Sequence, residues 1–211
     1  ASDDKKERLR AYVETYLKEE IQAEAIVRNL PGFARFMPVA ALCHGQVLSI
    51  EALARDCEVQ RTTVAGFIDV MVDTLLAQRL PAFEEKLRIK QRRHPKFYWL
   101  DAGVVRAAKQ RLGPLAIEER GALFEGLVFQ WILAYRECGL FEFDDVAYWS
   151  VTGSKSVEVD FVISRGDERF AIEAKASEKI RDEHLYGLRA IEELRGLKRR
   201  ILVYCGERTL R

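Results

Sequence analysis

Two neighbouring stretches of the chain alternate charged with apolar residues, and this pattern constrains the fold more than any other feature. They are Val157–Phe161 and Phe170–Lys175, joined by a short polar connection that contains Gly166. Residues two apart on a β-strand share one face, and a glycine suits a hairpin turn. The sequence therefore predicts two paired strands with charged side chains gathered on one face. Those charged residues are Glu158, Asp160, Glu173 and Lys175.

Charged groups within apolar strands cost several kcal/mol, in order of magnitude, unless they are paired or bind a metal. One interpretation is a buried Glu173–Lys175 salt bridge with no further role. The other is a divalent-metal site for phosphodiester cleavage, because such a site needs oxygen ligands and positive charge. For Glu158 the alternatives are a ligand role, a strand-edge charge or a pair with Lys155.

The metal interpretation assigns a role to each group. Asp160 and Glu173 supply two carboxylates, and the backbone carbonyl of Ala174 supplies a third oxygen for Mg²⁺ or Mn²⁺. Lys175 orients or deprotonates a water, or offsets phosphate charge. Glu125, on a preceding helix, holds a water or a second ion.

The bulk composition indicates a soluble cytoplasmic protein. The 211 residues are 48% hydrophobic and 32% charged with a net charge of +1, so only local clusters can favour an anionic partner. The cysteines are scattered without a Cys-x-x-Cys pair, which argues against disulfides and a zinc site. We find no signal peptide and no apolar run of membrane-spanning length, so no membrane partner is expected.

Three segments are predicted along the chain. Residues 1–35 hold an amphipathic helix, a packing or linker element that Pro31–Gly32 ends. Residues 36–112 form a winged helix-turn-helix domain, and residues 113–211 form an α/β domain.

The helix-turn-helix is predicted from two short helices joined by a tight turn. Ser49 is an expected N-cap for Ile50–Arg55, and a third helix runs over residues 60–76 with an apolar stripe. The start of this helix is where base or phosphate contacts are usually made. The candidate residues are Gln60, Arg61, Thr62 and Thr63.

A hairpin follows, from Leu80–Ile89 back through Phe97–Leu100, as the wing. Basic residues at alternate positions line one of its faces, as expected for phosphate contact. They could equally guard a solvated strand edge, and winged helices also bind proteins. The candidate basic residues are Lys86, Arg88, Lys90, Arg92, Arg93 and Lys96.

The third segment has the order helix, three strands, helix, strand. The helices are expected at 118–138 and 182–195, and the strands at 146–151, 157–164, 169–176 and 200–204. The last strand is continuously apolar, which predicts burial on both faces and a parallel partner. Asp101 is expected to cap a helix that begins near Gly103, and the three tryptophans Trp99, Trp131 and Trp149 are expected in the core.

This order and its acidic residues resemble the PD-(D/E)XK nuclease-like superfamily. Asp160 matches the metal-binding aspartate of that superfamily, Glu173–Ala174–Lys175 its Glu-x-Lys motif and Glu125 its first-helix acid. The resemblance implies an α+β, restriction-endonuclease-like mixed sheet flanked by helices, and a Mg²⁺- or Mn²⁺-dependent nuclease.

Nearly the whole chain also resembles the C-terminal part of bacterial and archaeal ATPases that carry a DUF4143 domain. The segments that carry this resemblance are 12–17, 61–64, 95–103, 123–125, 158–161 and 172–177. It implies that an AAA-type ATPase domain precedes the region in the full-length protein. The 211 residues contain no P-loop motif, so they cannot themselves form the ATPase.

The function expected from the sequence is a nucleic-acid-binding part of an ATPase, with DNA as partner and a nuclease-like site. The alternative is a catalytically inactive nuclease fold that docks the ATPase on DNA or protein. A third alternative is assembly, in which the first helix and apolar surfaces form a homo-oligomer.

Overall fold

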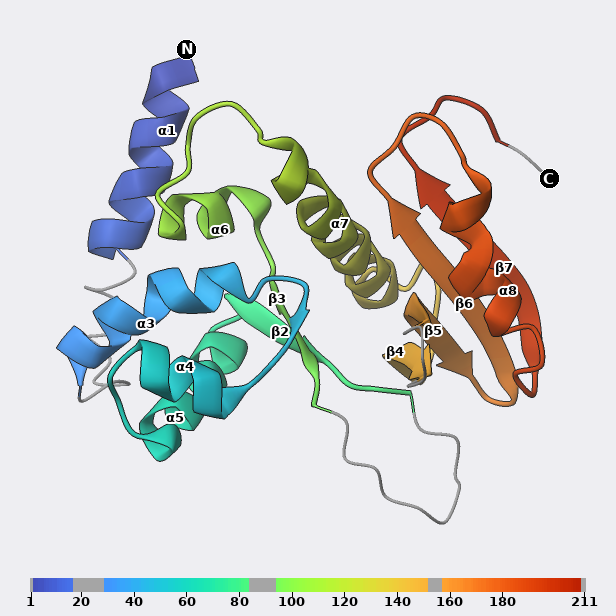
Figure 1. The fold of residues 1–211 in the computed structure, drawn as a ribbon, viewed down its shortest axis with the longest axis horizontal. Helices are drawn as coiled ribbons and strands as arrows, with labels where there is room; N and C mark the ends of the chain where they lie inside the picture. The colour runs from blue at the N-terminus through green and yellow to red at the C-terminus, as the bar shows by residue number, and fades with distance from the viewer. Residues whose placement is uncertain (1, 17–28, 84–93, 152–156, 210–211) are drawn as a thin grey trace. The chain divides into compact units, whose positions relative to one another are not determined.

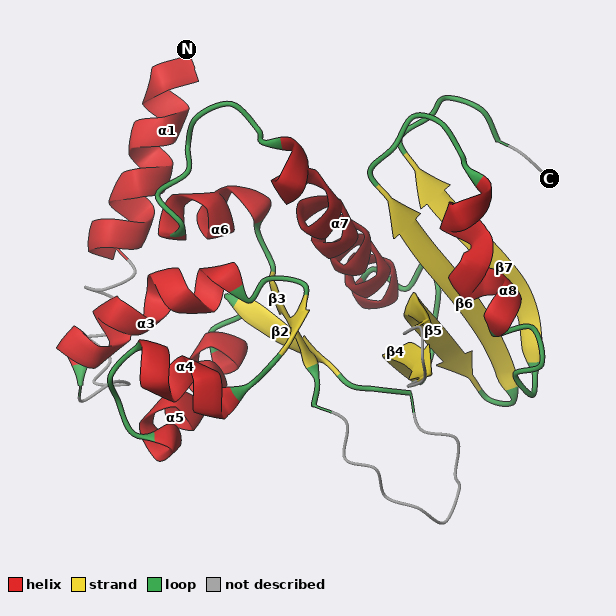
Figure 2. Ribbon diagram, viewed as in Figure 1, coloured by secondary structure: helices red, strands yellow, loops and turns green. Residues whose placement is uncertain are grey.

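The computed structural model describes residues 2–16, 29–83, 94–151 and 157–209 (Figure 1). These residues form two compact units, Ala1–Arg79 with Phe97–Ala116 and Leu80–Lys96 with Ile117–Arg211. Helices and two separate sheets make a mixed α+β fold, as the sequence predicts (Figure 2). The division into domains at residues 36–112 and 113–211 stays a prediction.

The first unit is mainly helical. Its helical elements are α1 (Ser2–Ala11), η1 (Tyr12–Tyr16), α3 (Leu30–Leu42), α4 (Ile50–Asp56), α5 (Arg61–Asp73) and α6 (Ala102–Ala108). Two predicted N-caps are confirmed: Ser49 Oγ accepts from Ala52 N at 3.3 Å, and Asp101 Oδ1 accepts from Val104 N at 2.7 Å. Each cap satisfies one backbone donor that the helix leaves free.

Pro31 and Gly32, expected to end the first helix, lie in the first turn of α3, and residues 17–28, where the first helix would end, lie outside the described residues. The side chain of Asn29 accepts a hydrogen bond from Gly32 N at 3.0 Å and caps the helix. Proline is well placed there, since the first helical N–H groups have no intrahelical partner.

Aromatic side chains fill the core of this unit. Phe67 of α5 lies with its ring centroid 5.2 Å from Phe33 and 5.4 Å from Phe36, both of α3. The indole of Trp99 is buried and donates to Ala40 O at 3.2 Å, so the prediction for this tryptophan is confirmed.

A three-stranded sheet, in the order β1-β3-β2, accompanies these helices. Its strands are β1 (Gln46–Val47), β3 (Lys96–Trp99) and β2 (Ala77–Leu80). The expected strand Leu80–Ile89 is described only as far as Phe83, where β2 ends at Leu80 and Ala82 forms an isolated bridge to Tyr148. Pro81 follows β2 and has no N–H to continue a ladder. Residues 84–93, and with them the predicted tip of the wing, lie outside the described residues.

The second unit has the predicted order of helix, three strands, helical segment and strand. Its elements are α7 (Ile117–Glu137), β4 (Asp145–Val151), β5 (Val157–Arg165), β6 (Glu168–Lys175), η2 (Asp182–Leu185), α8 (Tyr186–Ala190) and β7 (Leu197–Tyr204). The sheet order is β4-β5-β6-β7, antiparallel up to β6, and β7 runs parallel to β6. The helix expected at 182–195 is shorter, a 3₁₀ turn followed by α8.

Two expectations of burial are wrong in this unit. The predicted parallel partner of β7 is confirmed, but Ile201 is 37% exposed, so β7 is not buried on both faces. Trp131 is 49% exposed and lines an apolar pocket of about 890 Å³ together with residues of β6 and β7. The sequence pattern marks both residues as apolar but does not show which faces another element covers.

Candidate functional site

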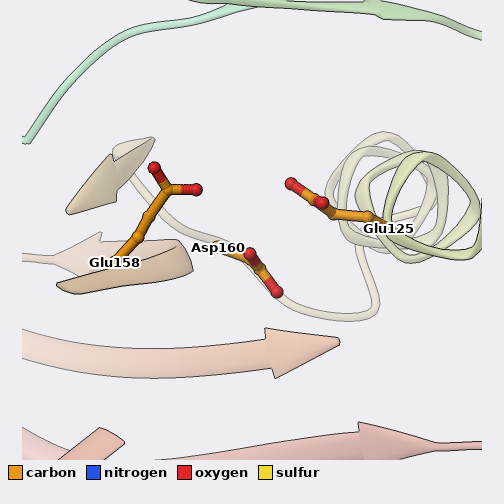
Figure 3. A group of neighbouring side chains, drawn as sticks. All are labelled: Glu125, Glu158 and Asp160. Carbon is orange, nitrogen blue, oxygen red and sulfur yellow. The ribbon is translucent and has the colours of Figure 1, made fainter. Parts of the chain in front are cut away.

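Three carboxylates meet where α7 faces strand β5. Glu125 reaches from α7 toward Glu158 and Asp160 of β5 (Figure 3). One carboxylate oxygen from each residue lies within 4.8 Å of the others. We call these three residues the acid cluster. The sequence predicted Glu125 and Asp160 as site residues and left a ligand role for Glu158 open.

The pairing of β5 with β4 shifts register next to Asp160, one residue of this cluster. Ala147 pairs with Val162 and Trp149 with Val159, so Tyr148 lies opposite two residues, Asp160 and Phe161. This is the residue count of a β-bulge, which turns the side chains of the bulged strand. Strict alternation had placed Phe161 on the face away from Asp160. In the structure Phe161 instead stacks on Phe129 of α7, with ring centroids 5.6 Å apart and planes 8° from parallel.

Asp160 is buried, with 6% of its surface exposed. Its Oδ2 accepts a hydrogen bond from Ala174 N at 2.8 Å, which ties the carboxylate to strand β6. Burial, followed by the negative charges of Glu125 and Glu173, raises the pKa of Asp160 to about 8. Both causes disfavour the ionised form of Asp160, because its carboxylate is desolvated and is repelled by two other carboxylates.

Glu173 and Lys175 form an ion pair on the same face of β6. Glu173 is 5% exposed, and its Oε2 has no hydrogen-bond partner among the described residues. Burial raises the pKa of Glu173, although Lys175 opposes the shift. Lys175 keeps about a third of its side chain exposed, 33%, so its ammonium group can reach a molecule in solution.

Lys96 is a buried cation of this site. It was expected in an exposed basic patch, but it is 4% exposed. Its Nζ lies 3.0 Å from Glu125 Oε1, pairs with Glu158 and lies 5.6 Å from the ring centroid of Tyr148. Burial alone would lower the pKa of Lys96, but Glu125 and Glu158 outweigh burial and raise it. Lys96 is therefore a charged component of the acid cluster and is not available to phosphate.

One signal in the sequence could have located Lys96. It begins the segment Lys96–Trp99, whose other three residues are aromatic and, in the structure, fully buried. A charge next to such a run faces the same cost of burial that marked the carboxylates of β5 and β6. The run of basic residues just before it, however, pointed to a surface.

A glycine allows α8 to approach the strand that carries the cluster. A Cβ atom on Gly187 would lie 2.1 Å from the backbone oxygen of Glu158 and 3.3 Å from Val159 Cγ2. Val159 and Leu188 lie in one buried apolar cluster on that face of the sheet. Helix α8 thus packs on β5 at Glu158, one of the three residues of the acid cluster.

The residues proposed to contact nucleic acid lie at the start of α5, in the first unit. Gln60, Arg61 and Thr62 are exposed, and Thr63 is partly exposed. Arg61 pairs with Glu51 at 2.6 Å. Lys86, Arg88, Lys90, Arg92 and Arg93 lie outside the described residues, as does Lys155.

His184, in η2, has a local partner. Its Nδ1 accepts a hydrogen bond from Arg181 N at 3.3 Å and so caps η2.

Among the helices that the structure describes, none combines the length and the apolar character needed to cross a membrane.

Two known protein families match the chain, one over each half. Residues 1–115, more than half of the chain, match DUF8612, a domain of unknown function. The chain belongs to the DUF8612 family. Residues 120–211 match DUF4143, also a domain of unknown function. The predicted resemblance to DUF4143 is therefore confirmed over these residues, on which Glu125, Asp160 and Glu173 all lie.

Two curated relatives are each 26% identical to this DUF8612 protein over 167 residues. They are Uncharacterized protein Mb2031c of Mycobacterium bovis and Uncharacterized protein Rv2008c of Mycobacterium tuberculosis. The match covers 78% of this chain and 36% of each relative, so the chain spans about a third of their length.

A solved structure, that of protein VC1899 from Vibrio cholerae, is also similar. It shares 18% identity with a TM-score of 0.33, and the match covers 100% of this chain and 48% of that one.

Proposed function

We propose that the second unit is a nuclease-like domain with a divalent-metal-dependent site for phosphodiester cleavage. The first unit, as a winged helix, binds the nucleic acid, with DNA as the expected substrate. In the full-length protein both would follow an AAA-type ATPase domain. The observation that carries this proposal is the charge of the site. Four carboxylates (Glu125, Glu158, Asp160, Glu173) face two ammonium groups (Lys96, Lys175).

This arrangement lacks two positive charges when all six groups are ionised. Buried charge without a counter-charge is costly, and proteins respond by protonating the group or binding a cation. The raised pKa of Asp160 is the first response. One divalent cation would supply the missing charge and allow Asp160 to ionise at neutral pH.

The ligand atoms fit Mg²⁺ or Mn²⁺. The expected ligands are carboxylate oxygens of Asp160 and Glu173 and the backbone carbonyl of Ala174, and hard cations prefer oxygen ligands. Glu173 Oε2 is buried without a hydrogen-bond partner among the described residues, as expected for an atom that binds an ion.

When bound, the cation would polarise a phosphodiester oxygen and stabilise charge in the transition state. The protein groups have separate tasks. Lys175, partly exposed and on the same face as Glu173, offsets the charge of the phosphate or orients the attacking water. Glu125 holds that water by accepting a hydrogen bond, and the bond from Ala174 N fixes the carboxylate of Asp160.

The test is a calorimetric titration of the chain with Mn²⁺ and Mg²⁺, beside Asp160→Asn and Glu173→Gln. We expect binding to the native chain and its loss in both variants. Glu168→Gln is the matched control, because Glu168 lies on the same strand but pairs with Arg165 near the surface. Cleavage of single-stranded, duplex and branched DNA and of RNA would then be compared in the same variants. Absence of binding at millimolar metal, with folding intact, rejects the metal site.

A second candidate is a docking module without catalysis. The ion pair between Glu173 and Lys175 favours it, since the pair balances the charges of both groups without an ion. This candidate predicts DNA binding that weakens steeply with salt and is the same in EDTA and in Mg²⁺. Metal-independent binding combined with no cleavage would select it.

A further inference from the structure

Lys96 lies where the acid cluster could otherwise hold a cation. Its Nζ is 3.0 Å from Glu125 Oε1 and pairs with Glu158. These two carboxylates, together with Asp160, are the group whose oxygens approach within 4.8 Å of one another. Carboxylates so close, on two different elements, are an arrangement that a metal ion could bridge.

We propose that the Lys96 ammonium replaces a second divalent cation, so that the site holds one metal ion at Asp160 and Glu173. This inference rests on the proposed function and specifies its metal content. It makes Lys96 a positioning residue, which holds Glu125 and Glu158 in place of an ion.

Space gives the first argument. A magnesium ion bridging Glu125 and Glu158 would lie about 2.0–2.1 Å from an oxygen of each. The Lys96 nitrogen already contacts both carboxylates, so the ion and the ammonium group would compete for one position. Two cations at such separations repel strongly in a buried site.

Charge gives the second argument. With Lys96 and Lys175 present, one divalent ion neutralises the four carboxylates. A second divalent ion would leave two positive charges in excess, with Lys96 only 4% exposed and unable to move its charge into water without a rearrangement.

Contacts within the second unit give the third argument. Lys96 belongs to this unit together with Glu125, Glu158 and Tyr148. The aromatic ring of Tyr148 lies 5.6 Å from the ammonium nitrogen and adds a favourable contact to the two ion pairs. These contacts hold the ammonium group at the cluster.

The test counts bound manganese by calorimetry and detects spin-coupled Mn²⁺ pairs by electron paramagnetic resonance. We expect one ion per native chain and no coupled pair. Lys96→Met removes the ammonium group from the acid cluster, so a second ion can bind there. We expect two bound ions per chain and the signal of a spin-coupled Mn²⁺ pair. Lys175→Met is the matched control: it removes the same charge from the other side of the site, and we expect it to bind one ion.

The outcomes separate the two proposals. Two ions on the native chain overturn the role of Lys96 and leave the metal site standing. One ion on both the native chain and Lys96→Met also overturns it. No ion on the native chain but one on Lys96→Met rejects the metal at Asp160 and Glu173 and keeps Lys96 as a substitute cation. No ion on either form rejects both proposals.

A further variant covers the case in which Lys96→Met does not fold. Lys96→Arg keeps the positive charge at the cluster, and we expect it to bind one ion as the native chain does. The resonance spectrum of the native chain at saturating manganese is then decisive, since a coupled pair there contradicts the inference without any variant.

Discussion

Lys96 Nζ lies 3.0 Å from Glu125 Oε1, although the two residues are 29 positions apart in the chain. The same nitrogen pairs with Glu158, so one buried cation links helix α7 to strand β5. Removing one member of a buried ion pair leaves the other charge uncompensated, which costs far more than the pair contributes. The stability of this region therefore depends on a residue that sequence reasoning placed at the surface.

Lys96→Met should lower the free energy of unfolding by about 3–5 kcal/mol in metal-free buffer at pH 7, because Glu125 and Glu158 lose their counter-charge. Urea denaturation followed by circular dichroism measures this. Lys198→Met is the control, since Lys198 is exposed and lies 3.9 Å from Glu168, and it should change little. Equal effects of the two substitutions would contradict the buried role of Lys96.

The free energy of unfolding should depend on pH through the titration of Asp160. Its folded pKa, about 8, lies above the value of about 3.9 for an unfolded aspartate, so the folded chain holds a proton that the unfolded chain releases. Unfolding free energy in EDTA should therefore fall as pH rises from about 4 to about 8 and then level off. Glu173, whose pKa burial also raises, contributes in the same direction.

Asp160→Asn should flatten this profile, because the amide does not titrate. Urea titrations at several pH values between 5 and 9 measure the slope. Saturating Mn²⁺ should also flatten the profile of the native chain if the ion binds ionised Asp160. A native profile that rises with pH over this range would refute the assignment.

Much of the fold could be predicted from local pattern. The caps at Ser49 and Asp101, and the antiparallel pair β5–β6 with its turn at Gly166, follow from short-range rules of side-chain spacing and hydrogen bonding. The parallel partner of β7 followed from its apolar run. The signal that predicts each of these features lies within a short stretch of sequence.

What the sequence did not reveal depends on contacts between distant elements. Strict alternation along β5 could not show the register shift against β4, which brings Phe161 onto Phe129. The pairing of Lys96 with Glu125 joins elements with no shared periodicity. The start of α3 is a local exception: proline is common both just after one helix and at the start of the next, and the Asn29 cap decides between them.

Gly187→Ala should destabilise the second unit and disturb the acid cluster. The added Cβ would meet the backbone oxygen of Glu158 at 2.1 Å, so either α8 or β5 must shift. We expect a lower midpoint of thermal unfolding and weaker Mn²⁺ binding. Gly121→Ala is the matched control: its Cβ would meet nothing within 4 Å, and alanine in the helix α7 should raise stability by about 0.5–1 kcal/mol. Unchanged stability in Gly187→Ala would contradict the close packing of α8 on β5.

Arg61→Ala tests the proposed nucleic-acid contact at the start of α5. Arg61 is exposed and its partner Glu51 is also exposed, so its loss should leave the fold intact. If Arg61 contacts phosphate, duplex DNA should bind more weakly regardless of sequence. The slope of log K against log salt should also fall by about one unit. Fluorescence anisotropy at several salt concentrations measures both the affinity and the slope.

Arg8→Ala is the control, because Arg8 is also an exposed arginine paired with a carboxylate, Asp4 on α1, and should leave the slope unchanged. Equal losses in the two variants would indicate a diffuse electrostatic attraction, and no loss in Arg61→Ala would remove the start of α5 from the interface.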